Sequence, residues 1–143
     1  MTQRTLGKGE FRISSDYLIL LAELAFEYGI STQDLLQNSD LSGDFLLRPD
    51  LPIGHESALL IIDNYCRRAP KESALAFGRR MTFSKHGALG FAAQYSQSID
   101  DAAETVLRYI ATRVQLFDLE RQRDNDVRQL FIRNKVPNSA AIE

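Results

Sequence analysis

The sequence predicts an α+β fold, a mostly helical domain that ends in a β-hairpin. Several capped segments with apolar residues at helical spacing occupy the chain as far as residue 114, and residues 115–134 then become rich in aromatic and branched side chains. The length of 143 residues suits one domain with a hydrophobic core. Hydrophobic residues make up 44% and charged residues 25%, as in ordinary globular proteins.

The N-terminal third predicts an arm followed by two helices. Residues 1–12 are polar and contain glycines, which is typical of a flexible arm or a short extended segment. The next stretch, "SSDYLILLAELAFEYG", starts with side chains that cap a helix and ends at Gly29, which can adopt the left-handed conformation. The apolar residues at helical spacing are Leu18, Leu21, Leu24, Ala25 and Tyr28. Ser31 and Asp34 then resemble a capping box at the start of a second, shorter helix.

This helix pair also suggests a DNA-reading helix-turn-helix over residues 15–38. A recognition helix presents polar and basic side chains to the groove. The segment "QDLLQNSD" is short and acidic and has no arginine or lysine. Direct DNA binding is therefore the weaker interpretation of this segment.

The middle of the chain predicts three further helices after a connector with prolines and glycines. One helix covers "HESALLIIDNYCRRA", where Cys66 occupies an apolar position and is expected to be a small buried residue. Another opens after Pro70 and is expected to end at Gly78, and a short helix lies within residues 84–96. Tyr17 and Phe91 are expected in the core.

The best-marked helix covers residues 98–114. Ser98 and Asp101 form a capping box at its start. A continuous apolar stripe is expected along it, formed by Ile99, Ala102, Ala103, Val106, Ile110 and Val114.

The segment "QLFDLERQRDNDVRQLFIRN" predicts the β-hairpin, with its tight turn at Asp124-Asn125-Asp126. A two-stranded hairpin is marginal by itself and needs further strands or a helix to cover it. We therefore expect either that the fold is incomplete within this sequence or that another copy completes the edges. Residues 134–143 form a tail without a structural signal of their own.

Composition and motifs disfavour several functions. The net charge of −2 is unlike that of a stand-alone nucleic-acid binder. The single cysteine excludes an internal disulfide and a cysteine-built zinc site, and the two histidines are 31 residues apart. Walker A, HExxH and G-x-S-x-G patterns are absent, as are an apolar run that could span a membrane and a signal peptide. We expect a cytoplasmic protein that is not an enzyme, with no catalytic residues, cofactor, metal or membrane partner.

The stretch "FGRRMTFSKHGALGFAA", residues 77–93, has two interpretations. In the structural one, Gly78 ends a helix, Gly87 permits a turn and Gly90 permits close helix packing. In the functional one, the cations before a helix N-terminus bind an anionic effector such as an amino acid, an organic acid or a nucleotide. Both interpretations stay open from the residues alone, as does a basic face for a partner domain.

These segments together resemble a known family. The helix "ISSDYLILLAELAFEYGIS", the connector "LLRPDLPIG" and above all "FGRRMTFSKHGALGFAAQYSQSIDDAAETVLRYIATRVQLF" are similar to the N-terminal effector-binding domain of AraC-type transcriptional regulators, in the subgroup labelled arabinose-binding. The resemblance covers roughly residues 13–133. The order and spacing of its elements carry it, since no single piece is specific.

The resemblance implies a sensor domain that binds a small-molecule effector, which the basic residues suggest is anionic. It implies that residues 13–133 are the N-terminal part of an effector-binding and dimerisation domain, and that DNA is bound only by a C-terminal pair of helix-turn-helix units absent from this sequence. A homodimer is expected. The candidate effector-binding residues are Arg79, Arg80, Lys85, His86, Tyr109 and Arg113. Tyr109 and Arg113 lie four apart on the predicted long helix, although a half-buried Tyr109 and a solvated Arg113 are the simpler interpretation. The alternatives are a dimerisation module without a ligand and a small enzyme.

Overall fold

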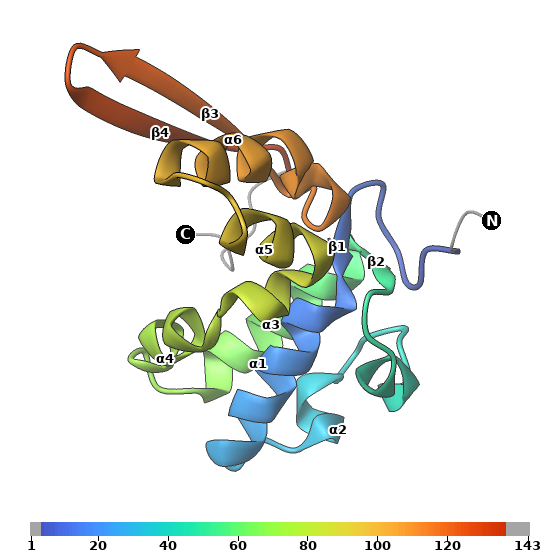
Figure 1. The fold of residues 1–143 in the computed structure, drawn as a ribbon. Coiled ribbons are helices and arrows are strands. Elements are labelled where there is room, and N and C mark those ends of the chain that lie inside the picture. Colours follow the sequence, from blue (N-terminus) through green and yellow to red (C-terminus); the bar gives the residue numbers. More distant parts are fainter. Residues whose placement is uncertain (1–3, 137–143) are drawn as a thin grey trace.

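A computed structural model describes residues 4–136 of the chain (Figure 1). The fold is α+β and 53% helical, with six α-helices and two small antiparallel sheets in the described part, as predicted. The α-helices are α1 Ser15–Glu27, α2 Thr32–Leu35, α3 His55–Arg68, α4 Ser73–Arg80, α5 Gly87–Gln94 and α6 Ile99–Tyr109. The strands are β1 Arg12–Ser14, β2 Pro52–Gly54, β3 Phe117–Asp124 and β4 Val127–Asn134. Three 3₁₀ segments are η1 Gly43–Leu47, η2 Phe83–His86 and η3 Ile110–Thr112.

The elements form two layers. The N-terminal layer, residues 15–80, groups α1 to α4, and the C-terminal layer, residues 83–134, stacks α5, α6 and the β3–β4 hairpin on one side of it (Figure 1). Within the C-terminal layer α5 packs against both η2 and α6. The hairpin extends away from the body at the far side of α6 (Figure 1).

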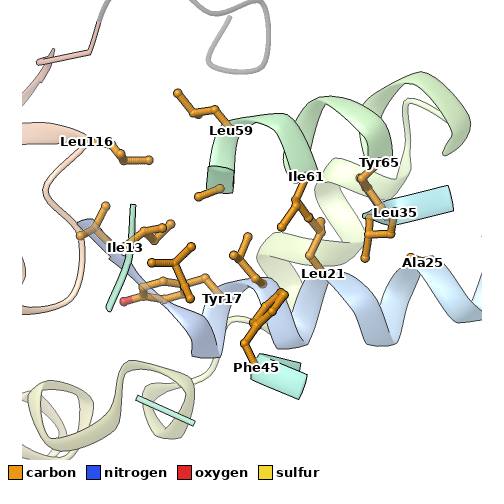
Figure 2. Packing of buried hydrophobic residues seen from close by; sticks show 14 of the residues in the cluster. Ile13, Tyr17, Leu21, Ala25, Leu35, Phe45, Leu59, Ile61, Tyr65 and Leu116 are labelled. Atoms are coloured by element: carbon orange, nitrogen blue, oxygen red, sulfur yellow. The ribbon is translucent and has the colours of Figure 1, made fainter. Parts of the chain in front are cut away.

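The hydrophobic core lies in the N-terminal layer. Figure 2 shows Tyr17, Leu21 and Ala25 along α1, which face residues of α3 and α2. Leu24, Ile53 and Ala58 are fully buried. Val114 and Leu116, which precede the hairpin, also reach into this core. By contrast no residue of α6 is buried.

Strand β1 connects the two layers. Its Ile13 lies opposite Ile53 of β2 on one side and forms an isolated bridge with Val114 on the other. The Ser14 N–H donates to the Arg113 carbonyl at 2.7 Å, and the Gln115 N–H donates to the Arg12 carbonyl at 2.8 Å. Part of the predicted N-terminal arm also lies along β2, since the Leu6 N–H donates to the Pro52 carbonyl at 2.9 Å.

The predicted helix starts are confirmed. Ser14, Ser31 and Ser98 are the N-caps of α1, α2 and α6, and each hydroxyl oxygen accepts a hydrogen bond from a backbone N–H of the first turn. Gly29 has φ +75° just after α1, in the left-handed conformation that favours glycine. These features depend on neighbours in sequence, which is why spacing alone predicts them.

The predicted helix ends are less accurate. The helix expected over residues 98–114 stops at Tyr109, and a 3₁₀ turn follows it. The backbone around Arg113 bonds to β1 instead, and a helix cannot supply that extended pairing. Gly78 was expected to end a helix but lies inside α4, which continues to Arg80.

Three side chains are more exposed than predicted. Cys66 is exposed because α3 buries Ala58, Ile61 and Tyr65 and turns the thiol toward an open cavity. Phe91 is 50% exposed, since α5 buries Leu89, Gly90 and Ala93 on its other face. Ile99, at the start of the predicted apolar stripe, is 86% exposed.

The hairpin is confirmed, with β3 and β4 paired from Phe117↔Asn134 to Asp124↔Val127. Its two-residue turn places Asn125 at φ +51°, a conformation that asparagine tolerates. Arg121 and Arg128 both form ion pairs with Asp100 at the start of α6, at 2.8 Å. All of β4 is exposed, including its apolar residues Val127, Leu130, Phe131 and Ile132.

No helix among residues 4–136 is long and apolar enough to cross a membrane.

Candidate functional site

A cavity of about 620 Å³ lies where the two layers meet. Its walls come from α1, α3, α4 and the segment 110–117 that leads into the hairpin. The apolar side chains around it are Ile13, Leu18, Leu21, Ile62, Ala69, Pro70, Ala74, Phe77, Met81, Ile110, Val114, Leu116 and Phe117. A volume of this size and walls of this kind are typical of small-molecule sites.

Sequence spacing explains why apolar side chains face the cavity. On α3, Ile62 and Cys66 are four residues apart and therefore lie on one side of the helix, next to the stripe that packs against α1. On α1, Tyr17 and Leu21 have the same spacing. The segment that closes the far wall is held in place by its bonds to β1.

Tyr17 and His86 form one polar edge of the cavity. The Tyr17 hydroxyl and His86 Nδ1 are 2.9 Å apart and hydrogen-bonded, and the two rings meet edge-on with centroids 5.6 Å apart. Burial, together with the positive charge of Arg113, lowers the pKa of His86. Burial also raises the pKa of Tyr17, although Arg113 partly offsets the effect. Both partners are therefore neutral near pH 7.

Arg113 lies behind this polar pair and joins three segments. Only 6% of its side chain is exposed, and its guanidinium forms ion pairs with Asp16 at the start of α1 and with Asp50. It also donates to the Lys85 carbonyl at 3.3 Å and lies 5.7 Å from the centre of the Tyr17 ring. Burial lowers the pKa of Arg113, but the hydrogen bond and charge of Asp16 more than compensate, so that its pKa is raised. Arg113 is permanently charged and holds η3 against both α1 and η2.

Gly87 makes room for this arginine. Its φ of +60° is in the region that favours glycine, and a Cβ there would lie 3.2 Å from the Arg113 guanidinium carbon. The predicted turn at Gly87 is therefore confirmed, and it serves the ion-pair cluster directly.

The Tyr65 hydroxyl is a second polar group near the cavity. Tyr65 is 3% exposed, and its hydroxyl has no hydrogen-bond partner of ordinary geometry among the described residues. Burial raises the pKa of Tyr65, and the neighbouring Ser73 hydroxyl lowers it in part. Unpaired buried hydroxyls are rare in folded proteins because they lose their bonds to water.

The six predicted site residues do not all lie together. His86 lines the cavity, and Arg113 and the Lys85 backbone lie behind it. The Lys85 ammonium is 3.7 Å from the Glu23 carboxylate, and Arg80 grips the Glu27 carboxylate with two hydrogen bonds of 2.6 and 2.8 Å. Arg79 and Tyr109 are exposed and do not line the cavity. Arg113, for which a solvated charge was the simpler interpretation, is buried.

His86 makes a pH-dependent contribution to stability. Its pKa is lowered in the folded chain, whereas the unfolded chain keeps the ordinary value near 6.5. Below that pH the histidine of the unfolded chain takes up a proton, whereas His86 of the folded chain does not. The free energy of unfolding therefore decreases as the pH is lowered from about 6.5 to the pKa of the folded chain. We expect urea denaturation between pH 7 and pH 5 to show a smaller loss of stability in His86→Gln than in the unaltered chain. Equal slopes for the two proteins would contradict this assignment, since their carboxylates titrate alike.

The sequence of the chain matches the model of a known protein family. The model described as the arabinose-binding domain of AraC transcription regulators, at their N-terminus, matches residues 29–141, well over half of the chain.

The chain belongs to this family.

The matching model describes a regulatory, ligand-binding domain of AraC-type regulators and not an enzyme family, and the match confirms the resemblance noted in the sequence. All six predicted site residues and most of the cavity walls lie within the matched range, while Ile13, Tyr17, Leu18 and Leu21 precede it. No curated protein matches the chain in a comparison of sequences. Among residues 4–136, no group of three or more His, Cys, Asp or Glu side chains is arranged to hold a metal ion.

Sequence reasoning about the AraC-type domain missed the residues that form most of the cavity. Lys71, Ser73 and Tyr65 border it, and none carries a motif. The apolar helical position of Cys66 predicts a buried thiol. In the structure the same position places the thiol at the wall of the cavity. The available signal was an apolar face on both α1 and α3 wider than one helix contact requires.

Proposed function

We propose that this domain binds a small-molecule effector in the cavity between its layers, and that binding controls a DNA-binding domain elsewhere in the regulator. The observation that carries the proposal is the composition of the cavity walls. Tyr17 and Tyr65 come from the N-terminal layer, whereas His86, Ile110 and Phe117 come from the C-terminal side. A bound molecule would contact both layers at once.

The proposed mechanism is a shift between two arrangements of the layers. A ligand changes such an equilibrium only through different affinities for the two states. The wall from Ile110 to Phe117 leads straight into the hairpin, so a change in its position would alter the surface that the hairpin presents. A regulator of this kind would act in the cytoplasm, where its DNA lies.

Among the predicted residues, we propose that His86 touches the effector and that Arg113 positions His86 and Tyr17. The earlier expectation of an anion bound by several cations has less support, because Arg80 and Lys85 face Glu27 and Glu23. Arg79 and Tyr109 are more suitable as contacts of a partner domain.

A thermal-shift screen against amino acids, sugars, nucleotides and apolar metabolites tests the proposal. A ligand at about one hundred times its Kd adds about 2.7 kcal/mol to the free energy of unfolding. We expect at least one compound to raise the melting temperature, and Ala74→Trp, which adds a large ring at the wall of the cavity, to abolish the shift. Ala92→Trp is the matched control, because Ala92 is exposed on α5 and does not line the cavity. A screen in which no compound stabilises the chain, or in which Ala74→Trp responds fully, would count against a sensor.

One observation favours a second candidate, a dimerisation module. The apolar residues of β4 are exposed on a hairpin that, within residues 4–136, neither α6 nor another strand covers completely. In that case light scattering of the chain without added ligand should report a homodimer. The Ile132→Lys variant should be a monomer under the same conditions. A monomer at all concentrations would remove this candidate.

A further inference from the structure

We infer that the cavity selects an apolar compound with one polar end, and not a sugar. The inference rests on the proposed function and adds the chemical class of the effector. It starts from the walls of the cavity, where, among the residues that the structure describes, only Tyr17, Tyr65, Lys71, Ser73 and His86 carry side-chain nitrogen or oxygen.

Few of these polar groups are free to bind hydroxyls. The Tyr17 hydroxyl and His86 Nδ1 already bond to each other across 2.9 Å, which leaves mainly the second ring nitrogen of His86 for a ligand. The Tyr65 hydroxyl lacks a partner of ordinary geometry among the described residues, but it is buried and is a single group at one place. A pentose carries a hydroxyl on nearly every carbon, and each must be matched by a hydrogen bond when it leaves water. Most sugar hydroxyls would instead face methyl, methylene and aromatic groups.

The position of Lys71 indicates where a polar end would lie. Lys71 borders the cavity yet is exposed, so it stands at the opening, and it forms no ion pair within residues 4–136. A compound whose apolar body fills the interior can place a carboxylate beside this ammonium while both remain partly in water. Such a contact adds modestly to affinity and fixes orientation.

Calorimetric titration of the 143-residue chain with three probes tests the class. The probes are 1-naphthaleneacetate, the neutral 2-(1-naphthyl)ethanol and L-arabinose. Both naphthyl compounds should bind at least tenfold more tightly than arabinose. Ala74→Trp should weaken naphthyl binding at least tenfold, whereas Ala92→Trp should leave it unchanged. Lys71→Met should weaken the acid a few-fold and spare the alcohol.

A second measurement uses the unaltered chain, so it does not depend on how a variant folds. Cys66 is the only cysteine in the sequence, is exposed and lines the cavity. A naphthyl compound in the cavity should therefore slow alkylation of Cys66 by N-ethylmaleimide, and arabinose at equal concentration should not.

The outcomes separate the class of effector from the function itself. Tighter binding of arabinose would overturn the inference and leave the sensor proposal standing. Naphthyl binding that neither protects Cys66 nor responds to Ala74→Trp would place the probe on another surface and overturn the inference. If no probe binds, the inference is wrong, and the sensor proposal then depends on the wider screen.

Discussion

Gly90→Ala is expected to destabilise the domain by about 3 kcal/mol, because the new methyl group would collide with backbone. A Cβ on Gly90 would lie 1.6 Å from the Phe83 carbonyl oxygen and 3.1 Å from the His86 Cβ. Neither can move unless α5 moves away from η2, which it packs against closely. Urea denaturation followed by circular dichroism would measure the loss. Because η2 carries His86, the variant should also lose the effector response.

Gly78→Ala is the matched control for this prediction. Gly78 lies inside α4, and a Cβ there would meet nothing within 4 Å. Alanine is about 1 kcal/mol more favourable than glycine inside a helix, so this variant should be stabilised by up to that amount. If Gly90→Ala were as harmless as Gly78→Ala, the close packing of α5 on η2 would be wrong.

Arg113→Met is expected to lower the free energy of unfolding by about 3 kcal/mol, the lower end of the range for breaking a buried ion pair. Methionine keeps much of the side-chain volume but removes the charge. Asp16, whose side chain is 17% exposed, would then lose its partner, and the Lys85 carbonyl would lose a donor. Denaturation by urea checks the size of the effect. Near-ultraviolet circular dichroism should also change as Tyr17 loses the neighbouring guanidinium.

Asp50→Asn separates the two acidic partners of Arg113. Asp50 has φ +59°, which asparagine also adopts, so the backbone should be unaffected. Its side chain is 76% exposed, and an ion pair with a solvated carboxylate contributes between about 0 and 1 kcal/mol. A large loss in Asp50→Asn beside a small loss in Arg113→Met would contradict the roles assigned here.

Local features of this fold follow from the sequence. The caps at Ser14, Ser31 and Ser98, the left-handed Gly29 and the Asn125 turn each depend on residues within a few positions, so spacing was enough to predict them. The α+β class and the resemblance to the family rest on the order of such features.

The candidate site could be predicted only in part. The sequence predicts His86 as one of several cations before a helix N-terminus, and the structure places it at the cavity. The burial of Arg113 could not be foreseen, because its partners Asp16 and Asp50 lie 97 and 63 residues away. The cavity was missed for a similar reason. Many of its walls are ordinary apolar positions of α1, α3 and α4, and the others come from segments that are distant in sequence.

The position of β1 has a consequence for how the chain is made. Residues 12–14 pair on one side with residues 52–54 and on the other with residues near 114. A ribosome releases β1 about one hundred residues before its second partner, so native pairing on that side has to wait for most of synthesis. Contacts so distant in sequence slow folding, since a long loop must close first. Nascent chains released before residue 113 should therefore remain open to proteases along β1, and longer ones should acquire protection in a single step.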